Sequence, residues 1–351
     1  MSHPRQSQSE LLRQQHLVEI CPSAHVREDR LSRAWRDMCW IVLGFLITAG
    51  CDAGPSSSDM DALSLPPFED SVLEDYMVAV NPDPSTLLPL INMELAPVVM
   101  VNLLHFHDEA QGNDFEGLSG REVYEQYIAA IADLQQDIGS RVIWDGGVDS
   151  QVVGISDPVF DVALLLEYQN VEAFLGFSTE IPNSASAART GGLEGQWLVA
   201  ATTIAEDGSP LGDGSGCGSW ERETATTATG LSPDQIARLF ATPEGVPVSM
   251  VELLRAGEGR PKELDAYLET RGEVIAAYGA RERWHGELVA QVIGTGSPSF
   301  EQMRVTEYPT RDCYIATLAD ERVVEQAQRR SEATELHWIY TASGVVFDTL
   351  H

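Results

Sequence analysis

The chain has 351 residues, of which 54 are acidic and 22 are basic, and its formal net charge is −32. A protein this acidic repels phosphate backbones and anionic headgroups, so we expect no nucleic-acid partner. An apolar content of 43% is enough for a sizeable core, and the length is typical of about two domains.

The first 50 residues have the pattern of an export signal. An uncharged apolar run, WIVLGFLITAG (40–50), is too short to span a bilayer and follows several arginines. The small residues directly before Cys51 resemble the cleavage site of a bacterial lipoprotein. We therefore expect a leader over 1–50, a lipidated Cys51, and anchoring to a membrane of the bacterial cell envelope, on its periplasmic or extracellular face. An ordinary cleaved signal or a short buried helix are the alternatives.

Residues 51–80 begin as a polar, acidic stretch without periodicity, so we expect a flexible, lipidated tether. Beyond it the only cysteines are Cys217 and Cys313. Export would permit them to pair, but Cys217 lies in a Gly/Ser-rich segment and Cys313 in an expected helix. These positions weigh against a disulfide and leave the pairing open.

Two parts of the chain, 81–204 and 232–345, resemble each other. The segment APVVMVNLL (96–104) recurs as VPVSMVELL (246–254). Further matches continue in register: Tyr127 with Tyr267, Trp144 with Trp284, Gly154 with Gly294, Glu167 with Glu307, Arg189 with Arg329, and Trp197 with Trp338. Chance does not keep so many tryptophans and glycines in register, so we infer an internal duplication, joined by a Gly/Ser-rich linker over 205–231.

Hydrophobic periodicity predicts the same order of elements in both parts. A short helix (83–91; 233–241) is followed by a strand (97–106; 247–255) and a long helix (119–138; 261–279). Two strands (141–154 and 159–168; 281–294 and 301–308), a second helix (170–189; 310–330) and a last strand (195–204; 335–342) complete each part. This βαββαβ order is ferredoxin-like.

The strand at 97–106 begins apolar on both faces, which indicates a sheet covered on both sides. Helices cover only one face of a ferredoxin-like sheet, so the other face needs a second sheet. We therefore predict an α+β fold in which two tandem ferredoxin-like repeats pack as an intramolecular, pseudo-dimeric α+β barrel, and we expect the protein to be a monomer.

The shared residues resemble domain of unknown function 1330, a family of the dimeric α+β barrel superfamily. The resemblance is carried by PVVMVNLLHF (97–106), Tyr127, the W-x-G at Trp144, and Glu167 with Tyr168. It implies the barrel fold, and because such proteins usually pair as homodimers, it implies a dimer fused into one chain. The family has no settled reaction, so the resemblance leaves the function open, and we expect no cofactor.

Five residues of the first copy are candidate ligand contacts: Asn102, Tyr127, Trp144, Glu167 and Arg189. Asn102 lies on an apolar face of its strand, where a buried amide must be paired, either to the framework or to a ligand. The second copy has Glu252 at this position, which counts against two equivalent sites.

The other candidates also have a structural alternative. Glu167 could be a general base if burial raises its pKa, or it could accept hydrogen bonds from neighbouring backbone. Tyr127 and Trp144 could line a pocket or fill the core. Arg189 could bind a carboxylate or complement the end of a helix.

His105 and His107 share a strand face, but no third ligand is evident and the second copy lacks both, so we expect no metal site. Motifs for nucleophilic, phosphoryl-transfer and metalloprotease chemistry are also missing. The sequence favours an exported lipoprotein that binds a small organic ligand in a pocket between sheet and helices. The alternatives are a cofactor-independent oxygenase or isomerase with Glu167 as base, and a non-catalytic scaffold or interaction module.

Overall fold

A computed structural model describes residues 65–70, 79–82, 84–155, 159–294, 300–347 and 350, all of which belong to one compact unit, Leu63–His351. The expected leader, the lipidation site Cys51 and the first part of the tether lie outside the described residues. In the described part of the chain, none of the helices combines the length and apolarity needed to cross a bilayer.

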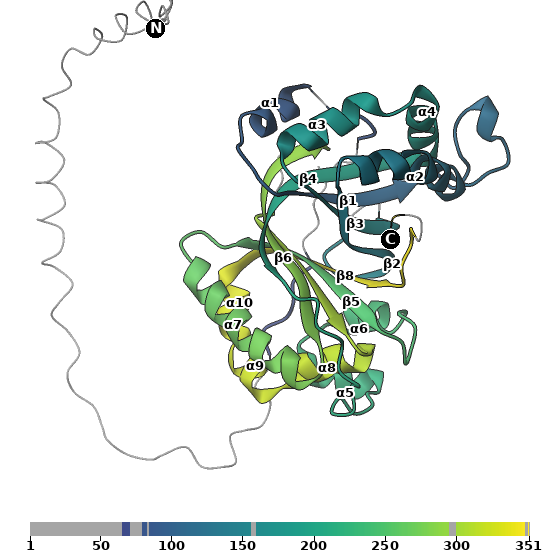
Figure 1. Ribbon diagram of the computed structural model, residues 1–351. Coiled ribbons are helices and arrows are strands. Elements are labelled where there is room, and N and C mark those ends of the chain that lie inside the picture. Colours follow the sequence, from purple (N-terminus) through teal and green to yellow (C-terminus); the bar gives the residue numbers. More distant parts are fainter. Residues whose placement is uncertain are drawn as a thin grey trace, which may run out of the picture. The chain divides into compact units, whose positions relative to one another are not determined.

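The described strands form one closed antiparallel barrel in the order β1-β3-β2-β8-β5-β7-β6-β4 (Figure 1). The first half supplies β1 (Val98–Phe106), β2 (Arg141–Val153), β3 (Val162–Tyr168) and β4 (Leu193–Glu206). The second half supplies β5 (Val248–Ala256), β6 (Arg281–Ile293), β7 (Gln302–Tyr308) and β8 (Thr334–Ser343). In each half the first strand pairs with the third and the fourth, and the halves join through β2–β8 and β4–β6.

Helices lie on the outside of the barrel, one set on each half (Figure 1). The first half carries α1 (Pro84–Ile91), α2 (Gly120–Asp137), α3 (Val171–Glu180) and α4 (Asn183–Gly192), with a short 3-10 turn at Asn113–Phe115. The second half carries α5 (Arg222–Thr229), α6 (Pro233–Leu239), α7 (Pro261–Ala277), α8 (Arg311–Ala319), α9 (Glu321–Glu325) and α10 (Ala327–Ala333).

The second helix expected in each half is broken into shorter ones. Ile181 and Pro182 are extended, and proline disfavours helical conformation in the residue before it, which separates α3 from α4. Asp320 is also extended, and its side chain accepts a hydrogen bond from the backbone N–H of Arg322. This cap ends α8 and starts α9, whereas the sequence predicts one helix over 310–330.

The barrel is filled, and its strands are buried on both faces. Along β1, Val99, Val101 and Leu103 belong to the interior cluster, together with four tryptophans. Met100 and Leu104 point the other way and pack under the helices of the first half. This alternation is the ordinary period-2 geometry of a strand.

Each half inserts a tryptophan against a glycine of the other half. Trp338 of β8 lies against Gly154, where an added Cβ would come within 2.0 Å of the indole ring. Trp197 of β4 lies against Gly294 in the same way, with a corresponding distance of 2.8 Å. Both glycines also have positive φ, 82° and 138°, so both contacts require glycine. The repeated glycines are therefore explained by packing between the halves.

The segment expected as a flexible linker (205–231) is attached to the second half. It contains α5, and Cys217 forms a disulfide with Cys313 of α8. The position of Cys217 among glycines had weighed against this pairing. However, the backbone N–H of Gly212 donates to the carbonyl of Gly279, which brings the segment beside α7 and α8.

Candidate functional site

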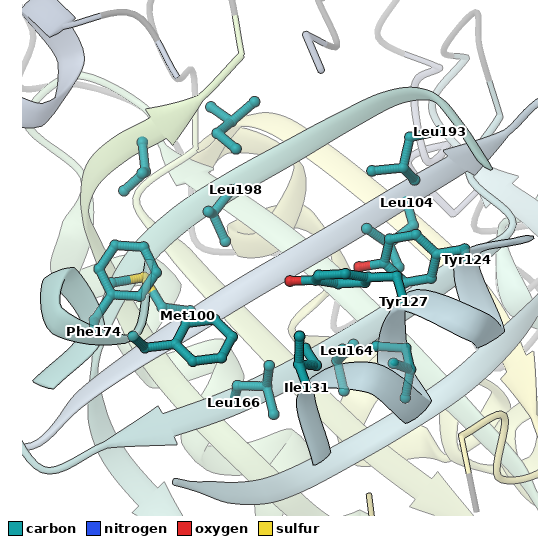
Figure 2. Close-up of a cluster of buried hydrophobic side chains, with 14 of the residues drawn as sticks. Met100, Leu104, Tyr124, Tyr127, Ile131, Leu164, Leu166, Phe174, Leu193 and Leu198 are labelled. Atoms are coloured by element: carbon teal, nitrogen blue, oxygen red, sulfur yellow. The ribbon is translucent and has the colours of Figure 1, made fainter. Parts of the chain in front are cut away.

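A cavity of about 260 Å³ lies between the sheet and the helices of the first half. Its walls come from α1, α2, α3, α4, β1, β3 and β4, with two residues of β6 from the second half. Most of the wall is apolar, as Figure 2 shows for Met100, Ile131, Leu164, Leu166, Phe174 and Leu198. A space of this kind suits a small organic molecule more than a polar or metallic ligand.

One edge of the cavity is polar. Asn102 of β1 donates from Nδ2 to the carbonyls of Met100 (3.0 Å) and Leu164 (3.4 Å). Its Oδ1 accepts a hydrogen bond of 2.6 Å from Nε2 of Gln196 in β4, whose own Oε1 accepts one of 2.5 Å from Nη2 of Arg189 in α4. The two amides thus form a relay that orients the guanidinium.

Arg189 is the only charged side chain among the described residues that line the cavity. Among the described residues no carboxylate lies within ion-pair distance of it, although the protein as a whole is strongly acidic. Only one of its five N–H donors is engaged by a side chain in this part of the chain. The polar edge therefore offers unneutralised positive charge and free donors.

Tyrosines of α2 add hydroxyl groups to the wall. Burial raises the pKa of Tyr127, and the neighbouring Arg189 partly opposes this shift, so the phenol is neutral at physiological pH. The side chain of Tyr168 is hydrogen bonded to Gln135. Tyr127 has no such partner among the described residues, so its hydroxyl is available to a ligand.

Three of the five candidate residues line the cavity together: Asn102, Tyr127 and Arg189. Trp144 does not, because the pairing of β2 with β3 shifts register between Val142 and Trp144. This irregularity turns both Ile143 and Trp144 into the barrel interior, on the opposite face of the sheet. The prediction that Trp144 lines the pocket is therefore not retained.

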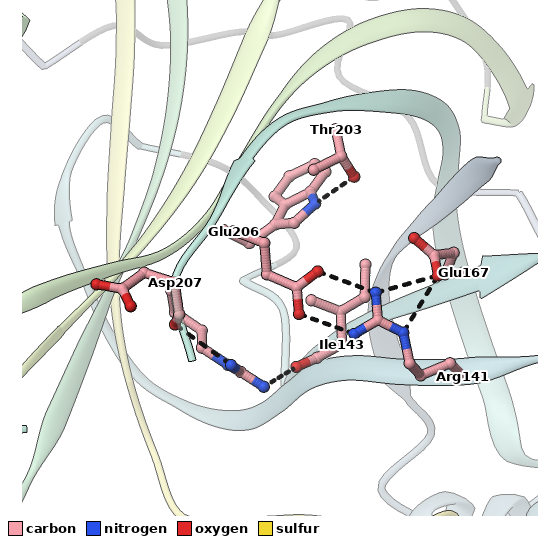
Figure 3. Close-up of polar contacts among 8 residues, drawn as sticks. Arg141, Ile143, Glu167, Thr203, Glu206 and Asp207 are labelled. Carbon is pink, nitrogen blue, oxygen red and sulfur yellow. Dashed lines mark hydrogen bonds and ion pairs between the residues drawn. The ribbon is translucent and has the colours of Figure 1, made fainter. Parts of the chain in front are cut away.

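Glu167 does not line the cavity either, and its carboxylate faces Arg141 instead (Figure 3). Its Oε1 is 3.0 Å from Nη2 of Arg141, which also binds Glu206 over 2.8 Å. In β3 it alternates with Leu166 and Tyr168, which do line the cavity. Glu307 pairs with Arg281 at the corresponding place in the second half. The repeated glutamate thus forms a repeated ion pair, and neither copy of it lines the cavity of the first half.

Gln196 also lines the cavity and is not among the residues that the sequence predicts for the site. It precedes Trp197, and strand alternation turns it to the helix-facing side of β4, where Leu198 also lies. Its counterpart in the second half, which precedes Trp338, is His337. Both copies thus have a polar residue at a buried position of the last strand, and this repetition could have identified Gln196 from the sequence.

The second half has different residues at the positions that line the cavity in the first. Glu252 stands where β1 has Asn102, and Arg271 of α7 stands where α2 has Ile131. The two form an ion pair of 2.9 Å with side chains only 5% and 3% exposed. Arg271 also donates to the hydroxyl of Tyr308. The longer, paired side chains occupy the space between sheet and helix, so the halves are not equivalent sites.

The histidines of β1 form surface contacts. Nδ1 of His105 is 3.1 Å from Asp161 and its Nε2 is 3.4 Å from Glu194. The hydrogen bond to Asp161 raises the pKa of His105. Across the described ranges, His, Cys, Asp and Glu side chains form no group of three that could hold a metal ion.

No family model matches the chain, and no curated protein matches it. A protein of unknown function from Rhodopseudomonas palustris is 22% identical, with 35% of this chain and 95% of that chain covered and a TM-score of 0.33. A protein described as a monooxygenase from Lactobacillus acidophilus is 10% identical, with 71% and 94% covered and a TM-score of 0.38. A chlorite dismutase from Candidatus Nitrospira defluvii is 10% identical, with 74% and 96% covered and a TM-score of 0.38.

These structural neighbours are proteins of the dimeric α+β barrel type. Their identities and TM-scores are low, so what their names say of activity remains a statement about those proteins. The function of this chain has to follow from its own site.

Proposed function

We propose that the protein binds a small, largely apolar organic molecule in the cavity of its first half. The observation that carries this proposal is a space of about 260 Å³ with apolar walls and one polar edge. Apolar cavities of roughly 150 Å³ already bind benzene in other proteins, so this volume admits a substituted ring or a short branched chain. The walls would supply affinity, and Asn102, Gln196, Arg189 and Tyr127 would fix the orientation.

The same proposal assigns the two halves different tasks. We infer that they are ferredoxin-like copies from one duplication, with copy 1 over 81–204 and copy 2 over 232–345, fused into a pseudo-dimer. The shared strand order and the reciprocal tryptophan–glycine contacts support this origin. Copy 1 binds the ligand, and copy 2, where Glu252 and Arg271 are paired, completes the barrel.

We also propose that the protein is a lipoprotein of the cell envelope, anchored through Cys51. The apolar run before this cysteine supports the proposal, and the Cys217–Cys313 disulfide is typical of an oxidising compartment. Replacing Cys51 with serine should move the protein from the membrane fraction to the soluble fraction. Retention of the variant in the membrane fraction would contradict the anchor.

The two alternative functions have less support. An oxygenase or isomerase with Glu167 as base needs this carboxylate beside a substrate, whereas it is paired with Arg141 away from the cavity. A silent scaffold needs the pocket positions to be packed against each other, whereas an open space lies between Asn102, Tyr127 and Arg189.

The proposal is tested by filling the cavity. A set of small organic compounds is screened by thermal shift on the full chain and on Leu198→Phe, in which a larger ring enters the space. We expect compounds that stabilise the wild type to lose their effect on Leu198→Phe, while this variant itself folds normally. The matched control is Ile339→Phe at the corresponding position of copy 2, where we expect a lower melting temperature because the ring is overpacked. Equal stabilisation of the wild type and Leu198→Phe by every hit would show that the hits bind elsewhere.

A further inference from the structure

A short segment before the first copy packs into the second. Phe68 is 5% exposed and belongs to the core beneath the helices of copy 2. The guanidinium of Arg330 lies over its ring, 3.3 Å from the ring centroid, and Nη2 of Arg330 donates to the carbonyl oxygen of Pro66 over 2.8 Å. One arginine therefore binds both an aromatic face and an oxygen acceptor of the same segment.

Arg330 is the counterpart of Arg189. In the alignment that pairs Trp338 with Trp197, Arg330 of α10 corresponds to Arg189 of α4. A constant offset of 140 residues pairs Arg189 with Arg329 instead, but Arg329 is exposed and its side chain contacts Gln326. The buried arginine of copy 2 is Arg330, and the structure corrects the alignment by one residue.

The other neighbours of Phe68 correspond to residues of the cavity in copy 1. Phe68, Val153, Ser331 and His337 line one small recess, and the rings of Phe68 and His337 are 5.8 Å apart. Each of these residues has a counterpart in the other copy: Val153 corresponds to Ile293, Ser331 to Thr190, and His337 to Gln196. Ile293, Thr190 and Gln196 all line the cavity. Phe68 thus lies at the place in copy 2 where the polar edge of the cavity lies in copy 1.

The segment is held there by contacts of its own. Gln235 of α6 donates to the carbonyl oxygen of Phe68 over 2.8 Å, and Arg238 forms an ion pair of 2.8 Å with Asp70. These contacts lie outside the positions shared by the two sites. They attach the segment to copy 2 alone and leave the corresponding place in copy 1 open.

We infer that residues 66–68 act as a built-in ligand of copy 2, and that the cavity of copy 1 takes a small aromatic carboxylate. This inference rests on the proposed function and names its ligand class. The ring would lie against the guanidinium of Arg189, as Phe68 lies on Arg330, and a carboxylate on a flexible arm would take the place of the Pro66 carbonyl. A carboxylate fits better than a neutral oxygen because Arg189 is the only charged residue among the described lining residues.

The inference is tested by calorimetry on the full chain with three related probes. These are 3-phenylpropionate, its neutral amide 3-phenylpropanamide, and the saturated acid 3-cyclohexylpropionate. We expect one molecule of 3-phenylpropionate per chain, with the amide at least tenfold weaker and the cyclohexyl acid several-fold weaker. Arg189→Gln should weaken 3-phenylpropionate to the level of the amide, and the control Arg329→Gln should leave it unchanged. Equal binding of all three probes would overturn the ligand class while leaving a binding cavity in place.

Absence of binding by all three probes would overturn the ligand class, and the compound screen on Leu198→Phe would then decide separately whether the cavity binds anything. A second measurement addresses Phe68 directly. Phe68→Ala should lower the melting temperature. When copy 1 binding is weakened by Arg189→Gln in the same chain, 3-phenylpropionate should restore more of this loss than 3-cyclohexylpropionate does. Equal restoration by the two acids would contradict the role of Phe68 as a ring ligand of Arg330.

Discussion

Gln196 and Asn102 are joined by a hydrogen bond of 2.6 Å, from Nε2 of the glutamine to Oδ1 of the asparagine. Because the Nδ2 group of Asn102 also donates to two backbone carbonyls, both ends of this buried amide are used. The asparagine therefore belongs to the framework and borders the cavity at the same time. The two readings of Asn102 that the sequence leaves open are not exclusive, since its framework role positions Gln196 and, through it, Arg189.

The first prediction concerns this relay. Asn102→Ala removes the oxygen that accepts the hydrogen bond from Gln196, and it leaves the buried amide of Gln196 without this partner. We therefore expect the free energy of unfolding to fall by about 1–3 kcal/mol. Urea denaturation measures the loss. Asn183→Ala, at an exposed asparagine of α4, should change the stability by less than about 0.5 kcal/mol. An Asn102→Ala variant as stable as the wild type would show that the hydrogen bond does not hold the site.

The second prediction concerns the buried ion pair of copy 2. Arg271→Ile alone leaves the carboxylate of Glu252 buried without its partner, so we expect a loss of about 3–5 kcal/mol. The double variant Glu252→Asn/Arg271→Ile restores the residues of copy 1 and removes both charges. We expect it to be close to the wild type in stability, since buried pairs are often replaced by uncharged residues at little cost.

A double-mutant cycle by urea denaturation measures this coupling. Additive losses in the double variant would contradict the assignment of Glu252 and Arg271 as a unit. The double variant should also have a larger internal space, which a crystal structure or xenon binding would detect.

Alternation along the strands was sufficient to find part of the site. Asn102 and Tyr127 follow from the face of β1 that carries Met100 and from the apolar stripe of α2, since both patterns are local. Arg189 follows from its place at the end of the helix that leads into β4. These residues meet in one cavity because β4, into which that helix leads, pairs with β1.

Other features depend on events that local patterns do not reveal. The register shift in β2 turns Trp144 to the other face of the sheet, since a change of one residue reverses the direction of every following side chain. Alternation along β3 places Glu167 on the opposite face from Leu166 and Tyr168, which line the cavity. The sequence alone could therefore have placed Glu167 outside the cavity. Its partner Arg141 lies on another strand, and only the pairing of strands brings the two together.

The attachment of residues 65–70 to copy 2 had no signal in the sequence. The segment lacks periodicity, and its contacts to Arg330 and Arg238 bridge residues far apart in the chain. The same holds for Cys217, whose Gly/Ser-rich surroundings suggested flexibility. Backbone hydrogen bonds from Gly212 to Gly279 and from Asp207 to Arg283, together with the disulfide, attach that segment to the second half.

The third prediction concerns the disulfide. Cys217 and Cys313 are 96 residues apart, so the bond closes a long loop in the unfolded chain. In the chain-entropy treatment such a loop contributes about 4–5 kcal/mol. We expect the double variant Cys217→Ala/Cys313→Ala to lose a large part of this amount in urea denaturation. Reducing agent should lower the stability of the wild type similarly and leave the double variant unchanged, whereas equal sensitivity of both proteins to the agent would contradict the bond.

The fourth prediction concerns pH. Burial, together with the charges of Arg330 and Arg271, lowers the pKa of His337 to about 3. In the unfolded chain this pKa is about 6.5, so between pH 6.5 and 3 the unfolded state binds a proton that the folded state does not. Stability should therefore fall as the pH drops below 6.5, and at pH 5 this one group would cost on the order of 2 kcal/mol.

His337→Gln, which introduces the residue found at the corresponding position of copy 1, should remove this part of the acid sensitivity. The measurement is the free energy of unfolding at a series of pH values between 4 and 8. His105→Gln is the control for the opposite direction. The hydrogen bond that His105 donates to Asp161 raises the pKa of His105, so the contribution of this histidine to stability is complete below pH 6.5 and is lost as the pH rises through the pKa of the folded state. His337→Gln should therefore reduce the fall in stability at low pH, and His105→Gln should reduce the fall at high pH. If the stability of His337→Gln falls at low pH as much as that of the wild type, other groups cause the acid sensitivity.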